Sequence, residues 1–177
     1  MTMYNDIFGI TPKNKGAGIN SKNKGDRNEN LAAKFLSLWV GSVFKRVPRS
    51  GGLGDKMPSL SGDVLDLSGK FLFCVETKHY KYIPIEGVLR NNTKIKVFWA
   101  QTIRDAERSG KFPLLMFRNN GMPKMTYIMY FNKSIASIII DIFLLKPISI
   151  FEDVYGFKSE EVIGRVDYKK FSKLLKI

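Results

Sequence analysis

A glutamate and a lysine stand where the sequence changes from apolar to charged, and an aspartate precedes them. Glu76 and Lys78 follow the apolar run from Phe71 to Val75, and Asp63 lies thirteen residues before Glu76. Side chains alternate between the two faces of a strand, so we expect Glu76 and Lys78 on the same face. Charges that continue a buried strand cost free energy unless they are paired or bind a ligand. The pattern therefore indicates either an ion pair at a strand end or a site with chemistry of its own.

Hydrolysis of a phosphodiester is the chemistry that these residue types suit. A turn at Ser68-Gly69-Lys70 lets Asp63 and Glu76 converge from neighbouring strands, and paired carboxylates with few nitrogen ligands favour Mg²⁺ or Mn²⁺. Such an ion polarises the phosphodiester and lowers the pKa of a bound water. Lys78 could hold the attacking water or neutralise charge that grows on the phosphate. We therefore predict a metal-dependent nuclease site, with a surface ion pair as the alternative.

Hydrophobic spacing predicts the elements that must position these side chains. Apolar residues recur at helical intervals over Asp26 to Val40, with Gly41 as a stop, and again over Ile95 to Arg108. Alternating or continuous apolar runs predict strands at 43–47, 62–67, 71–75, 113–118 and 125–131. The segment from Ile135 to Leu145 fits a buried helix or a strand, and Tyr168 to Lys176 fits a short basic helix or a tail.

The predicted order of helix, three strands, helix and two strands is typical of an α/β fold, with a central mixed sheet flanked by helices. We expect three regions along the chain. We expect a flexible basic N-terminal arm at residues 1–24, a core at residues 25–132 and a C-terminal extension packed on the core at residues 133–177. The arm could track a phosphate backbone or be a solvated tail.

The charge balance indicates a polyanionic partner. The 177 residues include 29 Lys and Arg against 16 Asp and Glu, a net charge of +13. Nucleic acid is the commonest such partner, and a basic composition kept for solubility is the alternative. The single cysteine, Cys74, allows no intrachain disulfide or cysteine-rich zinc site and favours a reducing compartment. With no signal peptide or membrane span evident, we predict a soluble cytoplasmic protein, and the abundance of Lys, Asn and Ile is typical of an AT-rich, viral genome.

Asp63 followed by Glu76-Thr77-Lys78 resembles the PD-(D/E)XK nuclease motif. Within that superfamily the sequence is most similar to archaeal-type Holliday junction resolvases and their phage relatives, and the likeness runs from about Lys24 to Asn119. Further similar segments are Lys24-Gly25-Asp26-Arg27-Asn28-Glu29, Arg46-Val47-Pro48-Arg49-Ser50-Gly51-Gly52, Trp99-Ala100-Gln101 and Gly110-Lys111-Phe112-Pro113-Leu114-Leu115. The resemblance implies a restriction-endonuclease-like core over residues 25–132.

The resemblance also implies the roles of the central residues. Asp63 and Glu76 would be direct metal ligands, with the backbone carbonyl of Thr77 contributing. Glu29 would complete the acidic cluster, either by orienting water or by binding the metal indirectly. Lys78 would be the catalytic lysine. The implied cofactor is Mg²⁺ or Mn²⁺.

Supporting residues and departures from the family pattern complete this prediction. Ser50 would lie in a mobile catalytic loop, and Gln101 would support the site from the second helix. The proline that usually precedes the aspartate is Gly62 here, so Asp66 or Asp55 could compete with Asp63. Residues after about 132 match no segment of the family.

Basic residues around the motif are candidates for contacts with DNA phosphates. His79, the only histidine, is expected on the opposite face of the strand from Lys78, where a structural or solvent-facing role is favoured over contact with DNA. The sequence has no dinucleotide fingerprint or Walker loop, so no nucleotide cofactor is expected. The predicted phosphate contacts are Arg46, Arg49, Lys56, Lys81 and Arg90.

The function that combines these features is a metal-dependent, structure-selective DNA endonuclease. The resemblance implies resolution of Holliday junctions or other branched DNA by paired nicks, which requires a homodimer with one site per subunit. Two alternatives stay open. One is another PD-(D/E)XK activity in restriction, repair or end processing, and the other is a basic DNA-binding protein without catalysis.

Overall fold

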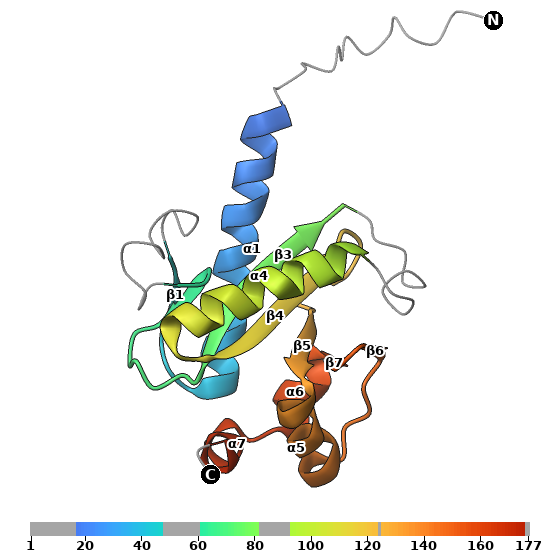
Figure 1. The fold of residues 1–177 in the computed structure, drawn as a ribbon. Coiled ribbons are helices and arrows are strands. Elements are labelled where there is room, and N and C mark those ends of the chain that lie inside the picture. Colours follow the sequence, from blue (N-terminus) through green and yellow to red (C-terminus); the bar gives the residue numbers. More distant parts are fainter. Residues whose placement is uncertain (1–16, 48–60, 82–92, 124, 176–177) are drawn as a thin grey trace, which may run out of the picture.

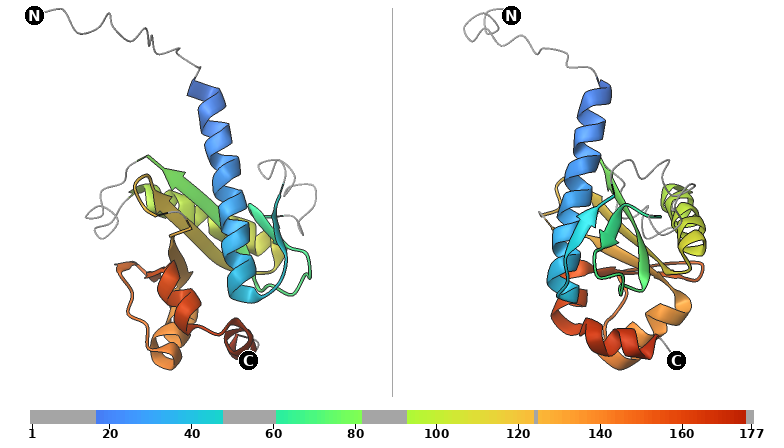
Figure 2. Two further views of the ribbon diagram at one scale, coloured as in Figure 1. Left: turned by 180° about the vertical axis from the view of Figure 1, so that it is seen from behind. Right: turned by 90° about the vertical axis from the view of Figure 1, so that its left-hand side faces the viewer.

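A twisted mixed sheet with helices on both faces forms the centre of the protein (Figures 1 and 2). The computed structural model describes residues 17–47, 61–81, 93–123 and 125–175. In this part of the chain seven strands make one sheet in the order β1-β2-β3-β4-β5-β7-β6. The strands are β1 (Phe44–Arg46), β2 (Val64–Asp66), β3 (Phe73–Tyr80), β4 (Phe112–Asn119), β5 (Ile128–Asn132), β6 (Ser149–Phe151) and β7 (Val154–Lys158).

One parallel pair stands among antiparallel neighbours. β3 and β4 run parallel, from Phe73 opposite Phe112 to Tyr80 opposite Asn119, and all other neighbouring strands pair antiparallel. Parallel strands need a crossover connection, and the crossover here contains α4. The helices are α1 (Ala17–Val40), α4 (Thr93–Ser109), α5 (Lys133–Phe143), α6 (Ser159–Arg165) and α7 (Tyr168–Leu174). The predicted α/β class with a mixed sheet flanked by helices is confirmed.

Each face of the sheet has its own core. On one face α1 packs with α5, α6 and α7, through side chains that include Phe35, Trp39 and Phe171. On the other face α4 packs through Ile95 and Trp99 against strand residues such as Leu115, Phe117 and Tyr130. The right-hand view of Figure 2 shows α1 and α4 on opposite sides of the sheet. The sheet is therefore held between two helices that both reach the end of β3.

The first helix is longer than hydrophobic spacing predicts. It begins at Ala17 instead of Asp26 and runs through residue 24, where we expected a flexible arm to end. Figures 1 and 2 show that its N-terminal turns project beyond the sheet. Helical periodicity is a consequence of burying one face, so turns that project in this way leave little signal. The helix ends as expected, because Gly41 adopts φ +73° and its N–H donates to the carbonyl of Ser37 at 3.0 Å.

The C-terminal region adds strands that the sequence did not predict. β7 pairs with β5 and β6 pairs with β7, so residues after 132 extend the central sheet. The ambiguous segment after Ile135 is helical, as α5, and the N–H of Ile135 donates to the side chain of Asn132 at its start. None of the helices in the described residues has the length and apolar character to cross a membrane.

Candidate active site

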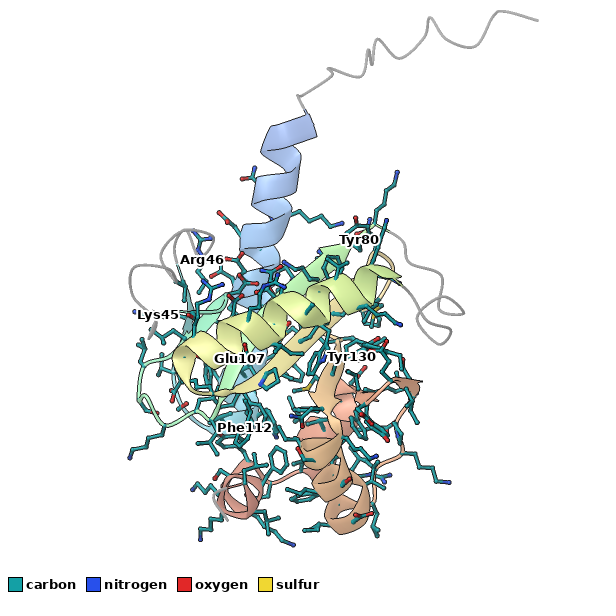
Figure 3. All side chains as sticks on the ribbon, viewed as in Figure 1. Lys45, Arg46, Tyr80, Glu107, Phe112 and Tyr130 are labelled. Carbon is teal, nitrogen blue, oxygen red and sulfur yellow. The ribbon has the colours of Figure 1, made fainter. Side chains whose placement is uncertain are left out.

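The second half of β3 has an open edge, and four of the predicted residues lie around it: Glu29, Asp63, Glu76 and Lys78. β2 pairs with β3 only where Val64 lies opposite Val75, whereas β4 pairs with β3 along its length. Among the described residues, β3 therefore has no strand beside it on the β2 side from Glu76 onward. A cavity of about 720 Å³ opens at this edge, with walls from α1 and α4 and a floor from β3. Figure 3 shows side chains from these elements gathered between the labelled Arg46 and Tyr80.

Asp63, just before β2, is held against β3 by its own backbone and side chain. Its N–H donates to the carbonyl of Val75 at 2.8 Å, and its Oδ2 accepts the N–H of Thr77 at 2.8 Å and the hydroxyl of Thr77 at 3.2 Å. Gly62 permits this approach, because its φ is +92° and a Cβ there would lie 2.8 Å from the carbonyl oxygen of Val75. Proline fixes φ near about −65°, so this backbone path excludes the proline usual in the family.

Glu76 and Lys78 form a buried ion pair on the α4 side of β3. Glu76 is 3% exposed, and its Oε1 accepts a hydrogen bond from Nζ of Lys78. Burial raises the pKa of Glu76 to about 8, and the carboxylate of Asp63 adds to that rise while Lys78 opposes it. Burial by itself would lower the pKa of Lys78, but Glu76, Asp63 and Asp105 together raise it above its usual value. The lysine is therefore a cation between carboxylates.

One face of α4 forms the wall opposite Glu76 and Lys78. Phe98, Gln101, Asp105 and Arg108 recur at helical spacing and all line the cavity. Nζ of Lys78 lies 5.5 Å from the centroid of the Phe98 ring, a distance at which an ammonium is attracted to the aromatic face. Asp105 forms an ion pair of 2.9 Å with Arg108. Gln101 thus lies in the cavity wall, and its supporting role stays a prediction.

The wall from α1 carries Glu29. Its pKa is raised, first by burial and then by the carboxylate of Asp63, while Arg46 opposes the rise. Nη1 of Arg46 lies 2.6 Å from Asp26 and 3.4 Å from Glu29. Arg46, which we predicted as a phosphate contact, therefore has partners within the protein. Its contact with DNA stays a prediction.

The opposite face of β3 is basic. His79, Lys24 and Lys81 line the cavity there, and Arg118 lies beside His79 on β4. Desolvation lowers the pKa of His79 to about 4, with further contributions from the charges of Lys24 and Arg118, while a hydrogen bond to Asn120 opposes them. The β3 floor of the cavity therefore has an acidic side toward α4, with the carboxylate of Glu76, and a basic side toward α1, with His79 and Lys81.

The oxygen donors at the open edge suit a hard divalent cation. A residue in a strand directs its N–H and C=O to the same side, so the carbonyl of Thr77 points toward the edge where its N–H meets Asp63. A cation would also stabilise the charged form of Glu76, which burial and the carboxylate of Asp63 disfavour. Across residues 17–47, 61–81, 93–123 and 125–175, no three His, Cys, Asp or Glu side chains are grouped to hold a metal. The role of Glu29, in orienting water or in binding the metal indirectly, stays a prediction.

Asp66, a competitor of Asp63 by sequence, has a structural role in the turn after β2. Its carboxylate accepts hydrogen bonds from Ser42, Ser68, Lys70 and Phe71. These bonds satisfy both oxygens and hold the turn together. Several other predicted residues lie outside the described part of the chain, and their roles stay predictions: Asp55, Ser50, Arg49, Lys56 and Arg90.

Sequence reasoning missed several residues that line the cavity. Arg104, Asp105 and Arg108 continue a helical face from Phe98, and this spacing could have identified them. Lys24 was assigned to an arm, and His79 was given a structural or solvent-facing role. No local pattern places those two residues beside Arg118, because their proximity depends on how α1 crosses the sheet.

Comparisons with known proteins agree with this architecture. A family described as "Phage putative PDDEXK endonuclease" matches residues 20–167. Protein D14 of Escherichia phage T5 is 31% identical over 107 residues, which cover 58% of this chain and 66% of that protein. The match thus spans slightly less than two thirds of the relative's own length. No solved structure matches the chain significantly.

Proposed function

This chain belongs to the phage PDDEXK endonuclease family, and from that membership we propose that the cavity between α1 and α4 is its active site, where it cuts branched DNA with Mg²⁺ or Mn²⁺. A nuclease acting on DNA follows from the family, and PD-(D/E)XK nucleases generally use divalent metals. The observation that carries the placement is the burial of Asp63 and Glu76 together beside Lys78 at the open edge of β3.

The roles proposed for the residues follow from their contacts. Asp63, Glu76 and the carbonyl of Thr77 would hold the metal, which when bound polarises the phosphodiester and acidifies a water. Lys78, held as a cation between carboxylates, would neutralise charge that develops on the phosphate. Glu29, farther along the α1 wall, would orient water. All of the residues to which these roles are given line the cavity.

The proposed substrate is a four-way junction or other branched DNA, cut by paired nicks. Basic residues stand on both sides of the cavity, at Lys24 and Lys81 and at Arg104 and Arg108. This distribution suits recognition of shape and backbone rather than of base edges. Paired nicks in a symmetric junction require two sites related by a two-fold axis, so we propose a homodimer. The resemblance to junction resolvases supports this step.

Cleavage of a DNA panel tests the proposal. The protein is incubated with a four-way junction, a three-way junction and a linear duplex of the same arms, with Mg²⁺, with Mn²⁺ and with EDTA. We expect metal-dependent paired nicks near the branch point, and none in EDTA. Glu76→Gln and Lys78→Ala should abolish cutting while junction binding persists. The matched controls are Glu107→Gln and Lys45→Ala, which change exposed residues away from the cavity.

Each other outcome identifies a different function. Equal cutting of linear and branched DNA would replace junction resolution with a restriction, repair or end-processing activity. Binding without cleavage in either metal would favour a DNA-binding protein without catalysis. Normal cutting by Glu76→Gln or Lys78→Ala would move the active site away from β3.

A further inference from the structure

The basic side of the cavity is built from three elements that meet at the end of the sheet. His79 on β3 lies opposite Arg118 on β4, on the face that α1 covers. The hydroxyl of Tyr127 is 3.3 Å from the carbonyl oxygen of Asn28 and 3.4 Å from its side-chain oxygen, which ties α1 to this face. Lys24 lies four residues before Asn28 and therefore on the same side of the helix.

Positive charge accumulates at this point, where Lys24, Lys81 and Arg118 lie close together. Burial lowers the pKa of Lys24, and the charges of Arg118 and Lys81 lower it further. No ion pair among the described residues involves any of these three. The acids of the neighbouring helical turn, Asp26 and Glu29, pair with Arg46 instead.

Two buried nitrogen atoms in the same cluster have no hydrogen-bond partner among the described residues. Arg118 is 5% exposed, and its Nη2 donates to the carbonyls of Met122 at 3.0 Å and Pro123 at 3.2 Å, which are neutral acceptors. Nε of Arg118 and Nε2 of His79 are buried and have no hydrogen-bond partner in the described residues. A buried charge without a partner costs free energy. Like charges held together in this way are stabilised by an anion with several acceptor oxygens.

We propose that Lys24, His79 and Lys81, with the charge of Arg118 beneath them, form a binding site for a DNA backbone phosphate other than the one that is cut. The site rests on the proposed function, because the same cavity must hold the DNA. Alternate residues of β3 face opposite sides of the sheet. A DNA strand that crosses the open edge of β3 would therefore meet Glu76 and Lys78 on one side and His79 on the other. This phosphate contact would fix the position of the strand relative to the acidic side.

Salt-dependent binding tests the site without any cleavage. Affinity of Lys24→Gln for a junction oligonucleotide is measured by fluorescence anisotropy in EDTA over a series of salt concentrations. The salt slope is the slope of the logarithm of the binding constant against the logarithm of the salt concentration. Loss of one phosphate contact should reduce the magnitude of this slope by about 0.9 and weaken binding about eightfold near 0.1 M salt. The matched control is Lys34→Gln, which removes the same charge from an exposed position farther along α1. We expect this control to keep the slope of the unchanged protein.

His79 provides a second measurement, because it is the only histidine in the chain. Its imidazole gives one set of NMR signals in the untagged protein. Added oligonucleotide should shift these signals in the unchanged protein and in Lys34→Gln, but much less in Lys24→Gln. Inorganic phosphate serves as a second probe, and a smaller shift with phosphate than with oligonucleotide is expected for a site that binds a DNA strand.

Two results would overturn the site. One is an equal loss of slope in Lys24→Gln and Lys34→Gln, which would mean that only total charge matters. The other is a His79 signal that oligonucleotide leaves unchanged. Failure of the proposed function looks different: the protein would not cut DNA, yet the effect of Lys24→Gln on binding would remain.

Discussion

At the scale of single residues, Glu76 is held in surroundings that oppose its charge. It is 3% exposed, and burial together with Asp63 raises its pKa to about 8. The ion pair with Lys78 offsets only part of this. Residues at functional sites are often kept in such unfavourable states. The same surroundings that disfavour the anion in the metal-free protein would favour a cation beside it.

The raised pKa of Glu76 predicts a specific dependence of stability on pH. The stability that the protonated carboxyl provides is fully present below the ordinary value of 4.5 and is lost as pH rises through about 8. Within that window each pH unit costs up to about 1.4 kcal/mol of unfolding free energy. Glu76→Gln removes this titration, so its unfolding free energy should fall less steeply with pH. Denaturant unfolding in EDTA, followed by the fluorescence of Trp39 and Trp99, measures the two slopes.

Glu107→Gln is the control for this experiment. Glu107 lies on the exposed side of α4, outside the cavity. The control should keep the slope of the unchanged protein across the same window. Parallel curves for the unchanged protein and Glu76→Gln would show that the carboxyl of Glu76 is not destabilised by burial.

At the scale of elements, the C-terminal helix α7 supports the helix that carries one wall of the site. Phe171 is fully buried and stacks on Phe73, with ring centroids 6.0 Å apart and planes at 15°. The ring centroids of Phe171 and Trp39 of α1 lie 6.2 Å apart. Nε1 of Trp39 donates a hydrogen bond to the carbonyl of Val166 at 2.8 Å. These contacts join α1, β3 and α7 into one core. The extension after residue 132 therefore contributes to the packing that positions Glu29 and Lys24.

Removal of the Phe171 ring should destabilise the whole protein. Phe171→Ala leaves a cavity among aromatic side chains, and such changes cost about 3–5 kcal/mol of unfolding free energy. Thermal and denaturant unfolding measure this loss. Lys173→Ala changes an exposed residue of the same helix and should stay within about 0.5 kcal/mol of the unchanged protein. A cost below about 1 kcal/mol for Phe171→Ala would mean that α7 is not docked as described.

At the scale of the whole molecule, charge is separated around the cavity. The chain carries a net charge of +13, yet Asp63, Glu76 and Glu29 are concentrated at the open edge of β3. Basic residues of α1, α4 and the end of β3 stand around this acidic centre. Under the proposed function, long-range attraction of DNA and local binding of a cation would depend on different residues.

This arrangement predicts DNA binding that depends strongly on salt. If about four or more phosphates are neutralised, affinity in EDTA should fall at least about 100-fold between roughly 50 mM and 200 mM salt. Anisotropy titrations with a junction and with a linear duplex give both slopes. Because phosphate contacts are independent of sequence, permuting the base sequence of the arms should leave the slopes unchanged. A fall of less than about tenfold would contradict a binding surface made mainly of basic residues.

Features that depend on local spacing could be predicted from the residues alone. The apolar run into Glu76 and Lys78 predicts a buried strand with both charges on one face, because side-chain direction alternates along any strand. The turn at Ser68-Gly69-Lys70 predicts that Asp63 lies on the neighbouring strand, and β2 pairs antiparallel with β3. The α4 helix and the mixed sheet were predictable for the same reason. The PD-(D/E)XK family was evident from the residues alone and is confirmed.

Features that depend on contacts between distant segments of the chain could not be predicted from the sequence and are seen only in the folded protein. The pairing of β7 with β5 joins segments that are far apart in sequence, and three- to five-residue strands give little local signal. Gly62 has a φ of +92° and lies against the backbone of Val75, a conformation that proline cannot adopt and that no local pattern in the sequence indicates. The meeting of Lys24, His79 and Arg118 depends on the path of α1 across the sheet. Spacing specifies the face on which a side chain lies, and tertiary packing specifies which residues it meets there.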